Sequence, residues 1–400
     1  MTTPTPYLGV SKSLSGKLWL ERTGDDRLAL AIAQRCQVPE LIGRLLAARG
    51  QTLDSVEGFL NPRLRDSLPD PSDLKDMDKA AERLARAVTK AEKIAIFGDY
   101  DVDGATSAAL LIRFLRAAGA PAPLLYVPDR MREGYGPNAA ALRQLKSAGA
   151  TVAVTVDCGI TAFAALEEAA SVGLDVIISD HHVAEPALPA AHAIVNPNRL
   201  DETFPHRNLA AVGVTYLLVV ALNRALRRAG WYTPSRPEPD LLQWLDLVAL
   251  GTICDVVPLG GLNRALAAQG LKVMGKRGNV GIQVLCDVAR VTERLEGFHC
   301  GFLLGPRVNA GGRVGRSDLG ARLLSTDDPT LALELAQELD ALNEERRALE
   351  ADVLAQATAL AEEEAARNPH ILMLAAENWH PGIIGIVAGR LKDRYQRPVC

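Results

Sequence analysis

Several features that would place a chain in a specialised class are missing from these 400 residues. The opening stretch MTTPTPYLGVSKS has no apolar segment of the kind that a secretory signal peptide needs. No uncharged stretch approaches the length of a membrane span. The six cysteines are scattered, with no CxxC pair and no zinc-ligand spacing, which is typical of reduced thiols in cytosolic proteins. We therefore expect a soluble, cytoplasmic protein without membrane contact.

The chain also lacks an excess of positive charge. It carries 44 lysines and arginines against 48 aspartates and glutamates, a formal net charge of −4. This balance does not indicate a nucleic-acid-binding protein, because such proteins usually present a basic surface. Any affinity for phosphate must therefore come from local clusters of basic residues.

Acidic residues and a pair of histidines follow four apolar runs. Runs rich in Val and Ile, bounded by Gly and separated by helix-like stretches, predict buried strands of a parallel sheet. In such sheets ligands bind beyond the carboxyl ends of the strands, and carboxylates so close together would repel one another unless a cation neutralised them. We therefore expect a divalent metal site, with two ions, at this edge. Its residues are Asp99, Asp101 and Asp103 in GDYDVDG, Asp157 in VDCG, Asp180, His181 and His182 in SDHH, and Asp255 in TICD.

The three alternating acids of GDYDVDG admit two other interpretations. A calcium loop of the DxDxDG type needs a glutamate near position 12 and flanking helices, whereas an apolar run that predicts a strand precedes this motif. Capping of a helix that starts near Thr106 would explain one acid but not three, and we expect Thr106 and Ser107 themselves to cap that helix.

The donor set of the expected site indicates which metal it holds. Cys158 and Cys254 adjoin two of the acids, but an oxygen-rich site suits harder metals, so we interpret both as small buried residues. Adjacent side chains diverge, so one of the two histidines can bind metal while the other faces substrate. The mixture of imidazole and carboxylates favours manganese, with magnesium as the alternative. Neither GxSxG nor a Walker A sequence is present, and a metal-bound hydroxide is the expected nucleophile.

Two arginine-bearing segments are the expected sources of positive charge. We interpret GPRVNAGGRVGRS as a loop whose glycines allow close approach to an anion. VPDRMREGYGPN is explained equally well as an anion-binding loop with a stacking tyrosine or as an ordinary solvated turn. A histidine before a helix start offers another anion site. The residues concerned are Arg307, Arg313 and Arg316, then Arg130, Arg132 and Tyr135, and finally His380.

The alternation of helix-like and strand-like segments from Met77 predicts an α/β fold with a doubly wound, mostly parallel sheet. Asp328 and Pro329 make a good helix start, and nothing breaks that helix before Asn368-Pro369. At 1.5 Å per residue it would run to roughly 58 Å and connect two domains. The expected parts are an N-terminal helical arm (1–76), the sheet domain (77–327), the long connecting helix (328–368) and an incomplete smaller α/β domain (369–400).

The last 32 residues are too few to bury a core of their own. We expect a strand in ILMLAAE, a turn in NWHPG, a helix in IIGIVAGRLKDRY and the opening of another strand in RPVC. This set predicts that the chain is a fragment of a longer protein.

With GDYDVDG, VDCG, SDHH and GTICD in this order, the chain resembles the DHH phosphoesterase superfamily. Within this superfamily, the chain resembles the RecJ family of single-strand-specific 5′→3′ DNA exonucleases. The resemblance lies in the stretches PDRMREGYG, GPRVNAGGRVG, WHPGIIGIVAGRLKDRYQRP, FLNPRL and LPDPSDLKDMDKA. The likeness covers nearly the whole chain. It implies a DHH domain and a DHH-associated domain with DNA in the cleft between them, followed in the family by an OB-type domain.

The same resemblance implies the activity and its partners. The substrate would be single-stranded DNA with a free 5′ end, degraded to mononucleotides in DNA repair and recombination. A single-strand-binding protein and a recombination helicase are candidate partners.

The resemblance also implies roles for individual residues. Asp157 would bridge two ions, and His182 would contact the scissile phosphate. Phe97 stands where some superfamily members have a histidine, so Asp99 would replace that ligand. The implied catalytic residues are Asp157, His182 and Asp103. The implied metal ligands are Asp99, Asp101, Asp103, Asp157, His181 and Asp255. The expected substrate-binding residues are Arg307, Asn309, Arg313, Arg130, Arg132 and His380.

Two rival functions belong to the same superfamily. One is a hydrolase of small substrates, namely pyrophosphate, cyclic dinucleotides or short oligonucleotides. The other is a non-catalytic scaffold of the replication machinery, whose expected sign is loss of the metal ligands. This chain retains them.

Overall fold

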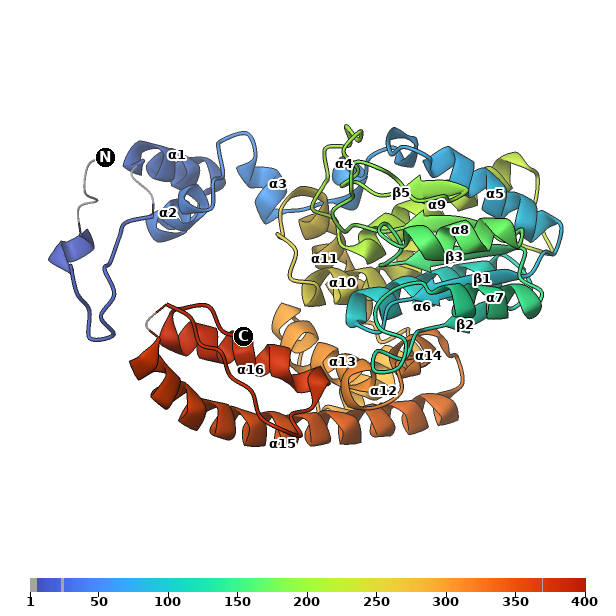
Figure 1. Ribbon diagram of the computed structural model, residues 1–400. Coiled ribbons are helices and arrows are strands. Elements are labelled where there is room, and N and C mark those ends of the chain that lie inside the picture. Colours follow the sequence, from blue (N-terminus) through green and yellow to red (C-terminus); the bar gives the residue numbers. More distant parts are fainter. Residues whose placement is uncertain (1–5, 23–24, 369) are drawn as a thin grey trace. The chain divides into compact units, whose positions relative to one another are not determined.

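The computed structural model describes residues 6–22, 25–368 and 370–400, and the chain forms two compact units, Met1–Ser67 and Leu68–Cys400 (Figure 1). In the first unit, Ile32, Leu46 and Val56 are buried against one another. Its elements are η1 (Tyr7–Gly9), α1 (Asp26–Cys36), α2 (Glu40–Ala48), α3 (Val56–Leu60) and α4 (Leu64–Ser67).

The first unit ends earlier than the helical arm predicted for residues 1–76. Residues 68–76 belong to the second unit, in which Leu74 is buried. The backbone N–H of Lys75 donates to Glu202, 2.9 Å away. The short helix η2 (Pro71–Asp73) lies in this segment. The predicted domain boundaries, at residues 76, 327 and 368, stay predictions.

The second unit is built around a five-stranded parallel sheet with strand order β2–β1–β3–β4–β5. The predicted doubly wound α/β fold is thereby confirmed. The order reverses between β1 and β3, and open sheets of this kind bind ligands at that point. The strands are β1 (Ile94–Gly98), β2 (Leu124–Tyr126), β3 (Val152–Val156), β4 (Asp175–Ser179) and β5 (Ala193–Val195).

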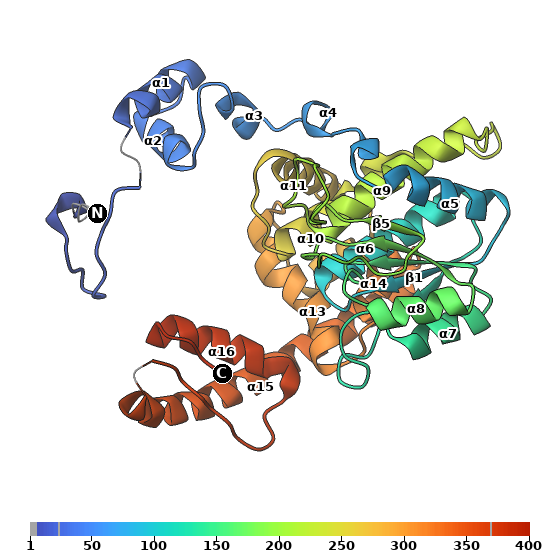
Figure 2. The ribbon, with the colours of Figure 1, turned by 45° about the horizontal axis from the view of Figure 1, so that its top comes forward.

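Helices cover both faces of this sheet (Figure 2). One face carries α7 and α8, whose buried side chains pack with Phe97, Ala153 and Ile178 of the strands. The other face carries α5, α6 and α9. The bounds are α5 (Met77–Thr89), α6 (Val102–Ala117), α7 (Ala139–Ser147), α8 (Phe163–Ser171) and α9 (Ala211–Arg228).

A helical layer follows the sheet, and it corrects two predictions. The apolar run before Asp255 is helix α10, not a strand. The side chains of this helix are buried on all sides, and the periodicity of such a run does not distinguish a helix from a strand. The predicted loop GPRVNAGGRV is helix α13, with Pro306 in its first turn. The elements are η3 (Leu241–Trp244), α10 (Leu245–Cys254), α11 (Gly261–Met274), α12 (Val280–Val288), the π-helical turn η4 (His299–Leu304), α13 (Gly305–Val314) and α14 (Leu319–Ser325).

The predicted long helix is confirmed as α15 (Pro329–Arg367), and Asp328 caps it by accepting from the N–H of Thr330. Helix α16 (Pro381–Tyr395) packs along it around Val353 and Ile383 (Figure 1). The strand predicted in ILMLAAE is wrong. This segment makes a single bridge, between Leu372 and Val399, because no further strand lies beside it in the described residues.

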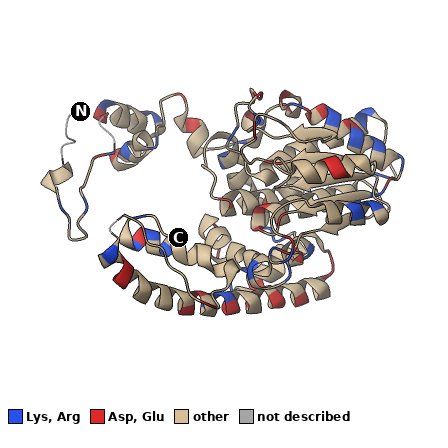
Figure 3. Ribbon diagram, in the orientation of Figure 1, with Lys and Arg blue, Asp and Glu red and all other residues tan. Residues whose placement is uncertain are grey.

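Acidic and basic residues are interspersed along α15 and over the helices around the sheet (Figure 3), in keeping with the small net charge. Across the described ranges, no helix combines the length and the apolar character needed to cross a membrane.

Candidate metal centre at the carboxyl edge of the sheet

The turn after β1 brings three acids to the edge of the sheet. Asp99 follows the strand directly, and Asp101 caps α6 by accepting from the N–H of Gly104 at 3.0 Å. A side chain at Gly104 would lie 2.6 Å from the Asp99 carbonyl oxygen, so the tight turn requires glycine. Helix α6 therefore begins at Val102.

The predicted capping role of Thr106 and Ser107 is wrong. Both lie buried inside α6, because the helix begins four residues before Thr106. The Thr106 hydroxyl donates to the carbonyl of Val102, one turn back, at 2.8 Å. The cap is Asp101 instead.

Asp103 connects this turn to two helices. Its buried carboxylate accepts from the N–H groups of Ala211 and Val212, at 2.6 and 2.8 Å, at the start of α9. Helix α10 packs so closely on α6 that a Cβ atom at Gly251 would lie 3.0 Å from an Asp103 oxygen. Asp255 follows α10 and so reaches the site from a helix end rather than from a strand end.

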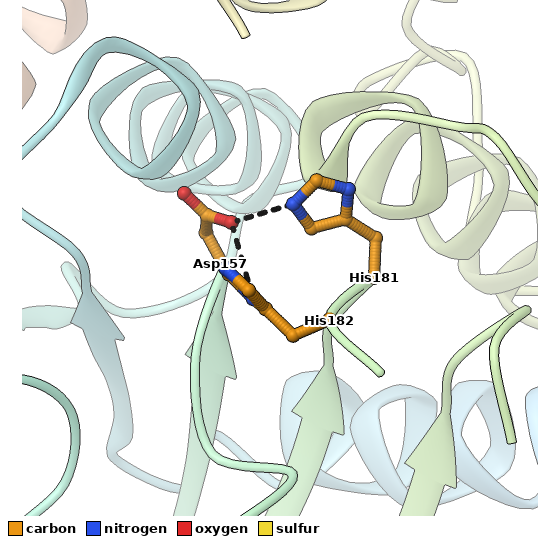
Figure 4. Close-up of side chains that lie close together, drawn as sticks. All are labelled: Asp157, His181 and His182. Carbon is orange, nitrogen blue, oxygen red and sulfur yellow. Dashed lines mark ion pairs between the residues drawn. The ribbon is translucent and has the colours of Figure 1, made fainter. Parts of the chain in front are cut away.

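The side chains of Asp157 and His181 point toward each other (Figure 4). The Nε2 atom of His181 is 3.3 Å from Asp157 Oδ1 and 3.9 Å from Asp103 Oδ2. Its Nδ1 atom lies 2.9 Å from the Leu209 carbonyl and 3.7 Å from Asp255. Asp157 has a φ of 61°, a left-handed conformation that is uncommon for residues other than glycine and recurs at functional sites.

His182 is held differently from its neighbour. Its Nδ1 atom lies 2.7 Å from Asp180 Oδ1, and its side chain is 47% exposed, against 14% for His181. Asp180 also accepts the backbone N–H groups of both histidines and of Ile160. Burial alone would raise the pKa of Asp180, but the bond and charge of His182 more than offset it, so the pKa is lowered. The pKa of His182 is raised by the same bond.

Burial and neighbouring negative charges disfavour the ionised form of several other carboxylates at the site. Burial and the charge of Asp101 raise the pKa of Asp99 to about 7. Burial and neighbouring carboxylates also raise the pKa values of Asp103 and Asp157. One buried oxygen each of Asp99 and Asp157 has no hydrogen-bond partner in the described structure. The Asp157 oxygen does lie 3.3 Å from His181 Nε2. Both oxygens can accept a cation, which would offset the cost of burying a carboxylate without hydrogen bonds.

The ligand atoms fall into three sets, and within each set they lie within 4.8 Å of one another. The first set joins Asp99 and Asp101 to Asp157, the second joins Asp103 and Asp255 to His181, and the third contains Asp157, His181 and His182. Asp157 and His181 each belong to two sets. The donors are oxygens with one or two imidazoles, which fits divalent ions such as manganese or magnesium.

Tyr135 touches this centre, a contact that its sequence position did not predict. Its hydroxyl donates to the Asp157 carbonyl at 3.0 Å and lies 3.4 Å from His182 Nδ1. Its ring meets those of Tyr100 and His182 edge to face. Burial raises the pKa of Tyr135, so the hydroxyl stays protonated. The only signal in the sequence is an aromatic residue in a glycine-rich loop.

Two of the predicted phosphate-binding arginines lie beside the acidic turn. The guanidinium of Arg130 lies 5.2 Å from the centre of the Tyr100 ring. Arg313, on α13, donates to the Gly382 carbonyl at 3.1 Å. Burial, together with the charges of Arg130 and Arg346, lowers the pKa of Arg313, although Asp101 and Tyr100 act in the opposite direction.

The other predicted phosphate-binding side chains already have protein partners. Arg307 pairs with Asp340 and donates to Leu303, both at 2.8 Å. Asn309 accepts from the N–H of Val102 at 3.1 Å. His380 caps α16, and Arg316 pairs with Asp318. Arg132 is 87% exposed, with Asp129 at 3.9 Å.

Comparisons with known proteins show which family this chain resembles. The DHH family, N-terminal domain, matches residues 93–252. The single-stranded-DNA-specific exonuclease RecJ of Dickeya dadantii is 41% identical, over 90% of this chain and 63% of the relative. The enzyme of that name from Escherichia coli is also 41% identical, over 91% and 63%. The chain thus spans less than two thirds of the length of these relatives.

Two solved structures share the fold. A crystal structure of exonuclease RecJ bound to manganese is 36% identical, with a TM-score of 0.71 over 82% of this chain and 79% of that one. RecJ from Thermus thermophilus in complex with Mn²⁺ is 32% identical, with a TM-score of 0.77 over 93% and 52%. Both the sequence relatives and the solved structures carry the same family name, and the chain belongs to the RecJ family of DHH proteins.

Proposed function

We propose that this chain is the catalytic part of a metal-dependent exonuclease that degrades single-stranded DNA from its 5′ end to mononucleotides. The observation that carries the proposal is the buried carboxylate cluster where the strand order reverses, in which one oxygen each of Asp99 and Asp157 lacks a hydrogen-bond partner. The similar proteins named above are single-stranded-DNA-specific exonucleases, and solved relatives hold Mn²⁺ or Mg²⁺. We place the activity in DNA repair and recombination.

Two divalent ions fit the donor sets, with manganese favoured over magnesium. One ion would be held by Asp99, Asp101 and Asp157, and the other by Asp103, His181 and Asp255. Asp157 as a shared ligand is supported by its Oδ1 atom, which lies 3.3 Å from Nε2 of His181, a proposed ligand of the second ion. When bound, such ions lower the pKa of a coordinated water and polarise a phosphoryl oxygen.

His182 is the residue that we assign to the scissile phosphate. Its Nδ1 atom is occupied by Asp180, so Nε2 is the nitrogen that remains for a substrate oxygen. The buried, ionised Asp180 fixes the ring orientation and favours the protonated imidazole. A protonated His182 can donate to a phosphate oxygen and stabilise developing negative charge.

The substrate phosphates would meet the arginines of α13 and of the loop after β2. Arg130 and Arg313 lie beside the acidic turn, and their neighbouring positive charges favour an incoming anion. Asn309 retains its amide donors, and Arg307 would exchange Asp340 for phosphate. His380 and Arg132 complete the proposed set, with Arg132 supported least because it is mostly exposed to solvent.

The substrate in this proposal is single-stranded DNA with a free 5′ end. A single-strand-binding protein and a recombination helicase are proposed partners, and the proposed location is the cytoplasm. The parts 77–327, 328–368 and 369–400 are proposed as the DHH domain, the connecting helix and the start of the DHH-associated domain.

The decisive experiment digests a single strand labelled separately at each end, with manganese or with EDTA. We expect mononucleotides to be released first from the 5′ end when manganese is present, and no release in EDTA. Asp157→Ala should abolish the release, whereas Asp352→Ala, at an exposed position of α15, should leave it unchanged. Cleavage of a dinucleotide or pyrophosphate but not of a long strand would show instead a hydrolase of small substrates. Equal release with EDTA would overturn the proposal.

A further inference from the structure

Two stacked phenylalanines stand exposed on the helical turn before α13. The side chains of Phe298 and Phe302 are 60% and 70% exposed. Their ring centres lie 5.1 Å apart with an angle of 22° between the planes. The chain has seven phenylalanines, and these two are the large exposed ones among the described residues. Leaving two large apolar side chains in water is unfavourable unless a ligand covers them.

The turn beneath the two rings is firmly anchored. His299, Cys300 and Leu304 point inward and are buried. His299 Nε2 lies 2.8 Å from a carboxylate oxygen of Glu293, and its Nδ1 accepts from the N–H of Glu296 at 2.9 Å. The exposure is therefore a property of a fixed surface. The turn is π-helical, and π-turns inside helices frequently mark functional sites.

The turn also adjoins the proposed catalytic machinery. The Cys254 thiol donates to the Cys300 carbonyl at 3.3 Å, and Cys254 directly precedes Asp255. In the other direction η4 runs into α13, and the Leu303 carbonyl accepts from Arg307. One short stretch of chain thus carries a flat aromatic face and the basic side chains assigned to phosphates.

We infer that Phe298 and Phe302 form a stacking platform for one base of the single-stranded DNA substrate. The inference rests on the proposed function and adds a base contact to its phosphate contacts. Single-strand-binding surfaces combine positive charge along the backbone with aromatic rings under the bases. Near-parallel rings offer a flat face that any base can cover, so the contact does not depend on sequence.

The test measures binding of a fluorescent single strand to the whole chain by anisotropy, in EDTA so that no hydrolysis occurs. Phe302→Ala should weaken binding roughly 5- to 150-fold, the range that base stacking provides. Phe302→Leu should weaken it similarly, because leucine is apolar but not flat, whereas Phe302→Trp should bind at least as tightly as the parent. Leu333→Ala removes an exposed side chain of α15 and should change nothing. Thermal unfolding of each variant checks that the fold is kept.

A strand with one abasic nucleotide, moved along its length, separates stacking from other effects. At one position of the abasic nucleotide, the parent should bind the strand more weakly than it binds the intact strand. At that same position the affinity of Phe302→Ala should hardly change. Equal losses for both proteins at every position would overturn the inference, as would unchanged binding by Phe302→Ala, which would leave the surface for a protein partner. A parent chain that binds no single strand would overturn the proposed function as well.

Discussion

Replacing Asp180 by asparagine should slow hydrolysis without emptying the metal centre. Oδ1 of Asp180 accepts three donors, namely the N–H groups of His181 and His182 and Nδ1 of His182, while Oδ2 accepts from Ile160. Asparagine can keep the three bonds at its oxygen, but its amide nitrogen then faces the Ile160 N–H, donor against donor. An unsatisfied buried pair of this kind destabilises the fold by roughly 1–3 kcal/mol.

The catalytic effect follows from the lost charge. A hydrogen bond to a charged group contributes about 1.5–3 kcal/mol, and its loss would leave His182 less well oriented and less readily protonated. If that whole contribution acts in the transition state, kcat falls about 10- to 150-fold. Asp175→Asn at the other end of β4 breaks a pair with Arg83 instead and serves as the matched control.

The assay combines single-strand digestion at saturating substrate with metal analysis by atomic spectroscopy. We expect Asp180→Asn to retain its manganese and lose turnover, and Asp175→Asn to keep both. Parent-like turnover of Asp180→Asn would show that the bond to His182 is only structural. Loss of metal from Asp180→Asn would show instead that Asp180 is itself a ligand.

Four further experiments have defined outcomes. His181→Ala should lower manganese content, whereas His182→Ala should keep the metal and lose rate; equal metal loss in both would mean that both bind metal. Arg307→Ala should lower kcat/KM about 10- to 100-fold at unchanged metal content, with Arg307→Lys recovering only part, because lysine lacks the planar fork; parent-like digestion would make Arg307 a structural partner of Asp340. Gly251→Ala should lower stability by roughly 1–3 kcal/mol and reduce activity, since the added carbon would lie 2.3 Å from the Thr106 hydroxyl; an unchanged melting temperature would contradict the close packing of α6 and α10. Burial raises the pKa of Asp246 to about 6, so the folded state holds its proton longer than the unfolded chain does and loses stability as the pH rises from about 4 to about 6. Asp246→Asn should therefore be more stable than the parent above pH 6, by on the order of 3 kcal/mol at most, and the difference should vanish near pH 4; urea unfolding at both pH values measures it, and a gap that does not change with pH would contradict the raised pKa.

The sequence predicted those parts of the fold whose pattern is local. The Val- and Ile-rich runs gave β1, β3 and β4, and Asp328-Pro329 gave the start of α15. Apolar runs buried on all sides were ambiguous, so α10 was taken for a strand. The glycines of GPRVNAGGRV suggested a loop, whereas Gly312 in fact lets α13 approach Tyr100 closely.

The candidate site was predictable in composition but not in its contacts. The turn after β1 and the ends of β3 and β4 brought the acids and histidines together because parallel strands end at one edge. The bond between Asp180 and His182 and the contact of Tyr135 with Asp157 depend on side-chain positions that no spacing encodes. The pairing of Arg307 with Asp340 joins residues 33 positions apart, beyond any local pattern.

Because α15 runs without a break, the number of its residues determines the direction in which the chain after it continues. Each residue of an α-helix turns the chain by about 100° and advances it by 1.5 Å. One residue inserted in the middle of α15 would therefore swing everything after it through more than a quarter turn. Gly382, at the start of α16, would then move away from the Arg313 side chain that donates to it. Seven residues, close to two full turns, would restore the direction but place α16 about 10 Å further along the axis. A change in the number of residues in α15 would therefore break the Arg313–Gly382 contact even if every side chain at that contact were kept.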